Sequence, residues 1–473
     1  MAAFDLELKI TQYALQSRYI ILMIQMHNGL DTYFVIKIPL LTPVQWKLHY
    51  LINLYTDPLI ISNAIIPDHD AGAFNPPRSK DEQVFILDKF ISITLGGFVR
   101  WDGVYFLHIS EYGYTYDNCL AFFPLFPFLV RFISCTILFP LHYIMTYRSV
   151  IIISAYLFNQ YIFIKSAVLV YRLGKKVLGN EVISYKAALL FCMNPASIFM
   201  SAPYSETLFS FLTFSSMLQF EQNQFWSACS IGLSFITRSN GIITAGFKLH
   251  MKVTEFLRQL ITMKKIHCKD KISGSIPTHL SVYGQQKGYK IINGRISPWC
   301  NYSIPIPYGY VQSEIWNVGF LKYYQFRQIP NFLLAIPVTI LSIFITLGLL
   351  PNDTDYKKSD RQESATTRDV LQSRRLLPYI FHLMFYVIFC WLFIHIQVMT
   401  RMVFSSSPVL YWYAAYIMTT EACEQPRQNY NKWDVSGFQS ETHKVETKYN
   451  LQHNIRNILT GPNFQFPLPE SSD

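Results

Sequence analysis

Hydrophobic positions fall in long runs along the chain, separated by polar blocks and followed by a polar tail. The runs lie at about residues 119–145, 149–171, 187–202, 204–218, 225–247, 331–350, 377–397 and 407–418, with a shorter one at 13–25. A helix crosses a bilayer with about 20 apolar residues. The pattern therefore predicts an all-α polytopic membrane protein with about seven to nine membrane segments, several of them short for a full crossing.

The polar blocks give an orientation. Residues 172–186 and 248–271 are rich in lysine and arginine, which favours the cytoplasmic side, and residues 357–375 form a third solvated loop. Strict alternation of crossings from the first helix disagrees with these charges. The disagreement is resolved if the run at 119–145, which two prolines interrupt, is re-entrant or lies along the interface.

These boundaries divide the chain into six expected regions. They are an N-terminal membrane segment with a probable insertion at 1–62, a first lumenal loop at 63–118, a transmembrane bundle at 119–247, a polar loop region at 248–330, C-terminal membrane helices at 331–418 and a polar, disordered tail at 419–473.

Composition excludes several classes of function. The chain has 473 residues, of which 51% are hydrophobic and only 15% charged, and its net charge of +10 fits basic loops that face anionic lipid. The sequence has no repeat of basic and aromatic residues, so binding to nucleic acid is not indicated. The eight cysteines form no CxxC pair, so neither a zinc site nor a disulfide framework is indicated.

Motifs of soluble enzymes are absent from the sequence. It contains no Walker loop, no GxGxxG after a strand, no HExxH and no GxSxG. Asp68 with Asp70, and Asp353 with Asp355, resemble the paired carboxylates that hold a metal in transferases of nucleotide sugars. Without an α/β nucleotide domain we interpret them as loop acids and expect no metal cofactor.

One carboxylate stands out by its position. Asp102 follows Trp101 in the polar segment 63–118, just ahead of the long series of apolar runs. An ionisable group near a membrane surface marks chemistry or a substrate path, although carboxylates that only face water are equally common there.

Several collinear blocks resemble the phosphatidylinositol-glycan class V family, mannosyltransferases of glycosylphosphatidylinositol (GPI) anchor synthesis. The blocks are NAIIPDH at 63–69, AFNPPR at 73–78, LGG at 95–97, WDG at 101–103, EYGY at 111–114, AFFP at 121–124, NPA at 194–196, YSE at 204–206, RSNG at 238–241, WNVGFLKYY at 316–324, QIPNFLLA at 328–335 and HIQVMTR at 395–401. They keep the order of the family over most of residues 63–412.

The resemblance implies a GT-C type glycosyltransferase of the endoplasmic reticulum membrane. Its donor would be dolichyl phosphate mannose, its acceptor a mannosylated glucosaminyl-phosphatidylinositol, and its product the second mannose in α-1,6 linkage. No separate cofactor is implied, because the lipid-linked donor is a substrate that stays in the bilayer. A small membrane partner subunit is a further partner, and the resemblance does not identify it.

The resemblance also assigns roles within the matched motifs. Asp102 becomes the catalytic base for the acceptor hydroxyl. Arg401 first, then Arg238, with Lys322, would stabilise the leaving phosphate, although each is equally explained as a cation that snorkels to the interface. Trp101 would stack on a sugar or would only anchor the chain at the interface.

The acceptor is expected to contact other residues of the same motifs. Trp316 and Asn317, together with Lys322, would lie in a loop over it. His395 and Gln397 are further candidates for substrate binding. They lie, like Glu206, inside or beside apolar runs, so each needs a polar partner, and structural pairing across the bundle is the simpler explanation.

The chain departs from the family at Gly72, where an acid is expected, and in three features of its spans. Residues 26–62 look like an insertion, residues 248–296 are polar where relatives have an apolar span, and no final C-terminal span follows. The alternatives are therefore a catalytically impaired or incomplete member that acts as a membrane scaffold, and a polytopic transporter. The second is disfavoured because no internal repeat is found. From the missing span we expect low activity.

Overall fold

A computed structural model describes residues 2–31, 72–74, 76, 85–222, 225–246, 278–289, 307–349 and 374–428. Every regular element in this part of the chain is a helix, so the predicted all-α class is confirmed there. The chain divides into a unit of residues 1–419 and a unit of residues 420–473. In the second unit the described residues, 420–428, are the end of a helix that begins in the first.

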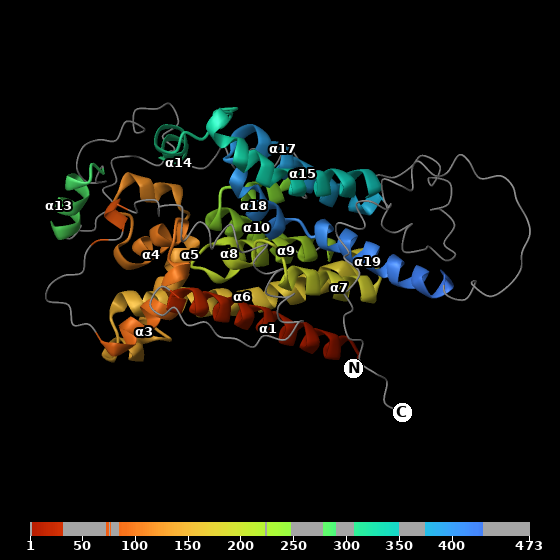
Figure 1. Ribbon diagram of the computed structural model, residues 1–473, viewed down its shortest axis with the longest axis horizontal. Helices are drawn as coiled ribbons and strands as arrows, with labels where there is room; N and C mark the ends of the chain where they lie inside the picture. The colour runs from red at the N-terminus through yellow and green to blue at the C-terminus, as the bar shows by residue number, and fades with distance from the viewer. Residues whose placement is uncertain are drawn as a thin grey trace, which may run out of the picture. The chain divides into compact units, whose positions relative to one another are not determined.

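The helices are given in chain order with the labels of Figure 1. The α-helices are α1 (Ala2–Asp31), α3 (Ile86–Leu95), α4 (Asp102–Tyr112), α5 (Leu125–Cys135), α6 (Tyr147–Leu178), α7 (Glu181–Cys192), α8 (Ser197–Ser201), α9 (Glu206–Glu221), α10 (Trp226–Thr237), α11 (Gly241–Thr244), α13 (Thr278–Gln286), α14 (Pro307–Tyr310), α15 (Ile329–Leu349), α17 (Leu377–Phe393), α18 (Met399–Ser406) and α19 (Val409–Gln428). Shorter 3-10 segments lie at Gly72–Phe74, Gly96–Phe98, Asp117–Ala121, Phe139–Tyr143, Phe326–Gln328, Arg374–Leu376 and Ile396–Val398, and a π-helical turn at Val311–Ile315.

The long helix α6 organises the first unit. It packs against α1, α7 and α9, and Figure 1 shows these helices side by side. The helix ends where Gly179 takes a left-handed φ of 66° and its amide donates to the Lys175 carbonyl, a helix stop that a residue with Cβ adopts less readily. Asn180 then caps α7 by accepting from the Ile183 amide at 3.0 Å.

This corner corrects one expectation. Residues 172–186 were predicted to be a polar loop, yet they are the end of α6 and the start of α7 with a break of two residues. Glycine and asparagine at the break are stop and start signals, whereas the charged side chains around it lie on the helices themselves.

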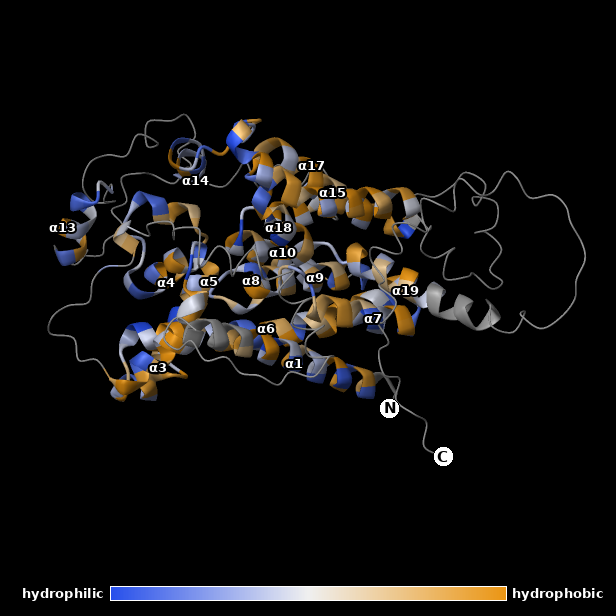
Figure 2. Cartoon of the chain, in the orientation of Figure 1, coloured by the Kyte–Doolittle hydropathy of each residue, from blue (hydrophilic) through white to orange (hydrophobic). Residues whose placement is uncertain are grey.

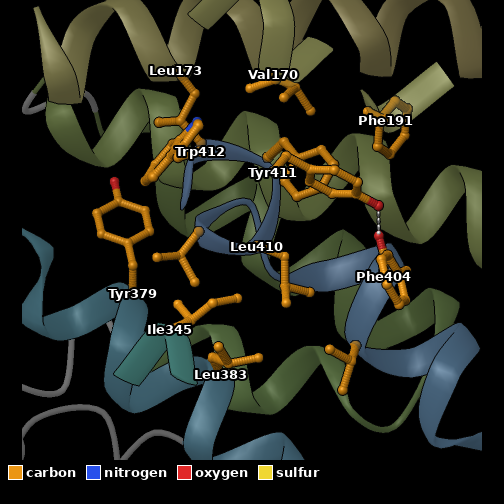
Figure 3. Packing of buried hydrophobic residues seen from close by; sticks show 14 of the residues in the cluster. Val170, Leu173, Phe191, Ile345, Tyr379, Leu383, Phe404, Leu410, Tyr411 and Trp412 are labelled. Carbon is orange, nitrogen blue, oxygen red and sulfur yellow. Dashed lines mark hydrogen bonds between the residues drawn. The ribbon is translucent and has the colours of Figure 1, made fainter. Parts of the chain in front are cut away.

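A large apolar core joins α6, α7, α9, α15, α17 and α19. Figure 3 shows Tyr411 and Trp412 of α19 packed between α6 and the side chains of α17. Trp412 lies edge-on to Tyr379 with 5.1 Å between ring centroids, and the Tyr411 hydroxyl donates to the Phe404 carbonyl at 2.7 Å. A buried phenol needs such a partner, so the bond fixes how α19 follows α18.

Two helices of the described part are long and apolar enough to cross a membrane, Tyr147–Leu178 and Phe326–Leu349. Figure 2 shows α15 and α17 largely in the colour of hydrophobic residues. Leu377–Phe393, Leu125–Cys135 and Trp226–Thr237 are apolar but shorter. The structure therefore has membrane-length apolar helices, fewer by this measure than the seven to nine segments that the sequence predicts.

Division of two apolar runs into short helices accounts for part of the difference. The run at 187–202 is divided between α7 and α8, because Pro195 disfavours a helical conformation for Asn194. The run at 119–145 forms three short helices, none of crossing length, which is compatible with the re-entrant or interfacial interpretation.

Helix α1 is longer than the run at 13–25 that predicted it. It covers Ala2–Asp31, so the first residues of the proposed insertion at 26–62 are helical and the others lie outside the described residues. Helix α19 continues to Gln428, into the tail expected at 419–473, and the other residues of that tail lie outside the described part. Asp68, Asp70, the polar block 248–271 and residues 357–373 of the third block also lie outside the described part.

Candidate active site

Asp102 is the first residue of α4, and the backbone before it is unusual. Trp101 has a φ of 43°, one of three non-glycine residues with positive φ among those described. Such a conformation is costly and persists only where the surroundings impose it. Gly103, which follows Asp102, explains part of the constraint. A Cβ added there would lie 3.1 Å from Pro203 Cγ and 3.4 Å from Tyr204 Cε2. The WDG motif thus lets α4 begin in contact with the 203–206 segment.

Arg401 pairs directly with Asp102. Its Nη1 lies 2.6 Å from Asp102 Oδ2 and 3.4 Å from Glu206 Oε1. The Asp102 side chain keeps 32% of its surface exposed, whereas that of Arg401 keeps 14%. Asp102 is therefore the carboxylate of this cluster that remains open to a substrate.

Glu206 joins Arg401 to a second arginine. It is the first residue of α9, and its side chain is 1% exposed. Arg238 Nη1 lies 2.5 Å from Glu206 Oε1 and 3.4 Å from the Ser205 hydroxyl. The backbone amides at the start of a helix also favour a negative charge there. Two acids and two arginines thus form one cluster of zero net charge, which is what makes burying them tolerable.

Aromatic rings hold the Arg401 guanidinium. Its Cζ lies 5.5 Å from the ring centroid of Phe199 and 5.8 Å from that of Tyr204, a separation at which a cation is attracted to a ring. Burial opposes the charge of Arg401, but the carboxylates of Asp102 and Glu206 outweigh burial and hold the pKa of the guanidinium above its usual value. Arg401 is therefore a fixed, permanent cation.

Arg238 is positioned by the turn that follows α10. The Gly241 amide donates to the Arg238 carbonyl at 2.9 Å, which closes the RSNG turn. The Ser239 and Tyr308 hydroxyls are 2.8 Å apart, and Tyr386 donates to the Asn240 carbonyl at 3.2 Å. The turn is thus fixed to α14 and α17, helices far along the chain.

Trp316 packs against Tyr105, which lies about one helical turn after Asp102 in α4. Its ring meets Tyr105 of α4 edge-on at 6.3 Å and Phe122 at 5.5 Å. His395 stacks on Tyr323 at 4.6 Å and bonds the backbone of Trp316. The structure therefore brings Trp316 and His395 together beside α4.

The other predicted residues lie farther from the cluster or at the surface. Trp101 is half-buried beside Asp102, while Asn317, with a φ of 52°, Lys322 and Gln397 are exposed. Within the described ranges, neither an ion pair nor a side-chain hydrogen bond links Lys322 or Gln397 to Asp102, Glu206 or the two arginines. The phosphate role predicted for Lys322 therefore gains no support from the structure.

Glu206 is the site residue that sequence reasoning placed only as a structural partner. The expectation that it needs a partner is confirmed by its ion pairs with Arg238 and Arg401. The signal was the YSE motif, an acid at the start of an apolar helix. In the described part of the chain, no group of three His, Cys, Asp or Glu side chains is arranged to hold a metal ion.

Comparisons with known proteins identify a family for the chain. Residues 47–449 match the family described as mannosyltransferase (PIG-V). The chain is 35% identical to GPI alpha-1,6-mannosyltransferase 2 of Cricetulus griseus over 76% of the chain and 80% of that protein. The Homo sapiens protein of the same name is 35% identical over 75% of the chain and 80% of its own length. GPI mannosyltransferase 2 of Drosophila pseudoobscura pseudoobscura is 34% identical over 76% and 87%.

No solved structure matches the chain significantly. The family match covers α4, α9, α10 and α18, and so includes all four charged residues of the cluster. With this match over most of its length and relatives of this identity, the chain belongs to the PIG-V mannosyltransferase family.

Proposed function

We propose that this mannosyltransferase adds the second mannose of the GPI anchor, in α-1,6 linkage, from dolichyl phosphate mannose to a mannosylated glucosaminyl-phosphatidylinositol. Its relatives carry the name GPI alpha-1,6-mannosyltransferase 2, which supports the reaction and the linkage. A donor on a polyprenyl phosphate suits a chain with membrane-length apolar helices, because the lipid stays in the bilayer. The endoplasmic reticulum membrane is the expected location.

Asp102 is the proposed catalytic base. The donor sugar is β-linked and the product α-linked, so the acceptor hydroxyl attacks C1 from the face opposite the phosphate. The hydroxyl loses its proton as the new bond forms, and a carboxylate placed beside it accepts that proton. Asp102 supports this role by its exposure, by the constrained backbone of Trp101 before it and by the cation against it.

Arg401 and Arg238 are proposed to bind the leaving group. As the bond from C1 to the phosphate oxygen breaks, its electron pair goes to dolichyl phosphate, whose negative charge grows. Two arginines that share one buried carboxylate provide a fixed positive region for that charge. A guanidinium also presents paired donors that match phosphate oxygens.

The acceptor is proposed to lie on the side of α4 that carries Tyr105. Trp316 packs against that ring and His395 bonds the backbone of Trp316, so both are placed to contact a sugar beside Asp102. Asn317 and Lys322 follow Trp316 in the same exposed loop, and Gln397 follows His395. They are proposed to contact the acceptor headgroup, with Trp101 on the mannose.

The observation that carries this proposal is the pairing of a half-exposed carboxylate, Asp102, with an arginine held by a second, buried acid. Complementation of cells that lack the second GPI mannosyltransferase tests it. Because a span is missing, the unchanged chain is expected to restore GPI-anchored proteins at the cell surface only to a low level, and the Asp102→Asn variant to restore none. Equal restoration by both would contradict the role of Asp102, and membrane insertion without restoration by either would favour a scaffold.

A further inference from the structure

Glu206 lies between the two arginines of the cluster. A single oxygen, Oε1, lies 2.5 Å from Arg238 Nη1 and 3.4 Å from Arg401 Nη1. The same Arg401 nitrogen lies 2.6 Å from Asp102 Oδ2. Arg401 thus interacts with two acids. Glu206 is buried away from solvent, and Asp102 is half-exposed and accessible to a substrate.

The charges of the cluster change in a defined way during the proposed reaction. Asp102, Glu206, Arg238 and Arg401 sum to zero, and the phosphodiester of the donor adds one negative charge. Transfer of mannose moves the acceptor proton to Asp102 and the electron pair of the broken bond to the phosphate. The total stays the same, while one negative charge leaves Asp102 and appears on dolichyl phosphate.

Arg401 is built to follow that charge. Its Nη1 already faces Asp102, while its buried Nε has no hydrogen-bond partner in the part of the chain that the structure describes. A buried donor without a partner is costly, so Arg401 has hydrogen-bonding capacity that its ion pairs do not use. Phe199 and Tyr204 hold the guanidinium from its sides, so its partner can change while its position stays the same.

We propose that Glu206 is a positioning residue that holds Arg401 and Arg238 at the donor phosphate while Arg401 exchanges Asp102 for that phosphate. This inference rests on the proposed function. Glu206 touches neither the acceptor nor the reacting bond; it acts through the two arginines. Its negative charge also offsets theirs, so that dolichyl phosphate is released after transfer instead of being retained.

The isosteric variant Glu206→Gln separates this role from a structural one. Without the buried charge, Arg401 keeps Asp102 as its one carboxylate partner among the described residues, and the two arginines attract anions more strongly. We expect kcat to fall about 10- to 100-fold, because the cation no longer passes freely to the phosphate. The KM for dolichyl phosphate mannose should stay the same or fall, and dolichyl phosphate should bind at least about threefold more tightly.

The experiment uses the full chain purified in lipid nanodiscs. Steady-state kinetics give kcat and KM for the donor, and binding of dolichyl phosphate, measured without acceptor, reports the phosphate site independently of turnover. Glu221→Gln is the matched control, because Glu221 lies at the other end of α9. Its carboxylate is 2.8 Å from Arg375, and this pair is separate from the cluster. The kcat and KM of Glu221→Gln should stay within about twofold of the unchanged chain.

Several results would overturn the inference. They are an unchanged kcat, a raised KM with unchanged kcat, and weaker binding of dolichyl phosphate by Glu206→Gln. If that variant fails to accumulate, Glu206→Asp decides, since it keeps the charge but is one methylene too short to reach both arginines. Its kcat should fall at least about fivefold with KM nearly constant, and a normal kcat would refute the role.

Failure of the proposed function has a different signature. An unchanged chain that binds dolichyl phosphate but transfers no mannose from dolichyl phosphate mannose would refute the reaction. The binding of dolichyl phosphate by Glu206→Gln and Glu221→Gln would still test what Glu206 does to the two arginines.

Discussion

The phenol of Tyr204 donates a hydrogen bond of 2.9 Å to the backbone carbonyl of Arg100. The bond joins the segment that carries Glu206 to the residue just before Trp101 and Asp102, although the two lie about a hundred positions apart in the chain. The same ring also flanks Arg401. Tyr204 therefore sets the distance between the proposed base and the arginine that pairs with it.

Tyr204→Phe keeps the ring but removes the bond to Arg100. We expect the free energy of unfolding of the purified chain to fall by about 1 kcal/mol, the usual contribution of one such bond. We also expect kcat to fall by a larger factor than KM changes, because Asp102 loses its fixed position. Tyr143→Phe, at an exposed tyrosine, is the control and should change neither. A normal kcat for Tyr204→Phe would show that Gly103 and Pro203 position Asp102 without the bond.

Asp102→Asn removes proton acceptance with almost no change in volume. Activity should fall about 100-fold or more, since general base catalysis contributes that much, while the amount of protein in the membrane is unchanged. Mannose transfer in microsomes measures this, with Glu111→Gln as control on the same helix, where Glu111 pairs with Arg148 at 3.1 Å. Activity near that of the control would remove Asp102 from the chemistry.

Arg401 should depend on both charge and shape. Arg401→Ala should abolish use of the donor and leave Glu206 and Asp102 without this cation, whereas Arg401→Lys should recover part of the rate because a point charge remains but the planar fork is lost. Titration with dolichyl phosphate mannose measures kcat and KM of each. A Lys variant no better than Ala would mean that only the fork matters.

Arg18 is a buried cation without a carboxylate beside it among the described residues. It donates to the Ser197 carbonyl at 2.8 Å and the Ser201 hydroxyl at 3.0 Å, and lies 3.8 Å from the ring centroid of Phe163. Arg18→Gln should lower the free energy of unfolding by roughly 2 kcal/mol or more, because carbonyls lose a charged donor. The melting temperature in detergent reports it. Arg172→Gln, at a more exposed pair with Glu7, should cost less than about 1 kcal/mol.

His108 predicts how stability depends on pH. Burial, with the nearby Arg148, lowers the pKa of its imidazole from 6.5 to about 3, so the ring is neutral in the folded chain. The unfolded chain takes up a proton below about pH 6.5, and stability should therefore decrease as the pH falls from about 6.5 toward 3. His108→Gln can still bond the Thr115 hydroxyl and should flatten this part of the melting-temperature profile; an equally steep profile would assign the loss to other groups.

The sequence predicted the elements whose signal is local. The apolar runs at 149–171, 331–350 and 377–397 became α6, α15 and α17, because length and hydrophobicity act within each helix. The breaks were harder to place: the charges around Gly179 indicated a loop, whereas the structure needs only a capped corner. A charged residue can remain on a helix when its side chain extends to the interface or forms an ion pair. Composition alone does not distinguish such a helix from a loop.

Motifs identified the members of the site but not how they meet. Asp102, Arg238 and Arg401 followed from their blocks, and so did Lys322, which lies exposed and away from the ion cluster. All four have the right charge for their proposed roles, and only the packing of distant helices decides which of them come together. The bridge through Glu206 was out of reach for the same reason, since α9, α10 and α18 meet only in the folded bundle.

The partners of Arg18 give the chain an order of events during synthesis. Arg18 leaves the ribosome 179 residues before Ser197, to whose carbonyl it will donate a hydrogen bond. At about 5 to 20 residues per second, the cation waits roughly 10 to 40 seconds for that partner. The first helix to be made is thus not locked in place by this residue until α7 and α8 emerge, and until then its arginine remains at the interface, where water or a lipid phosphate serves as a temporary partner.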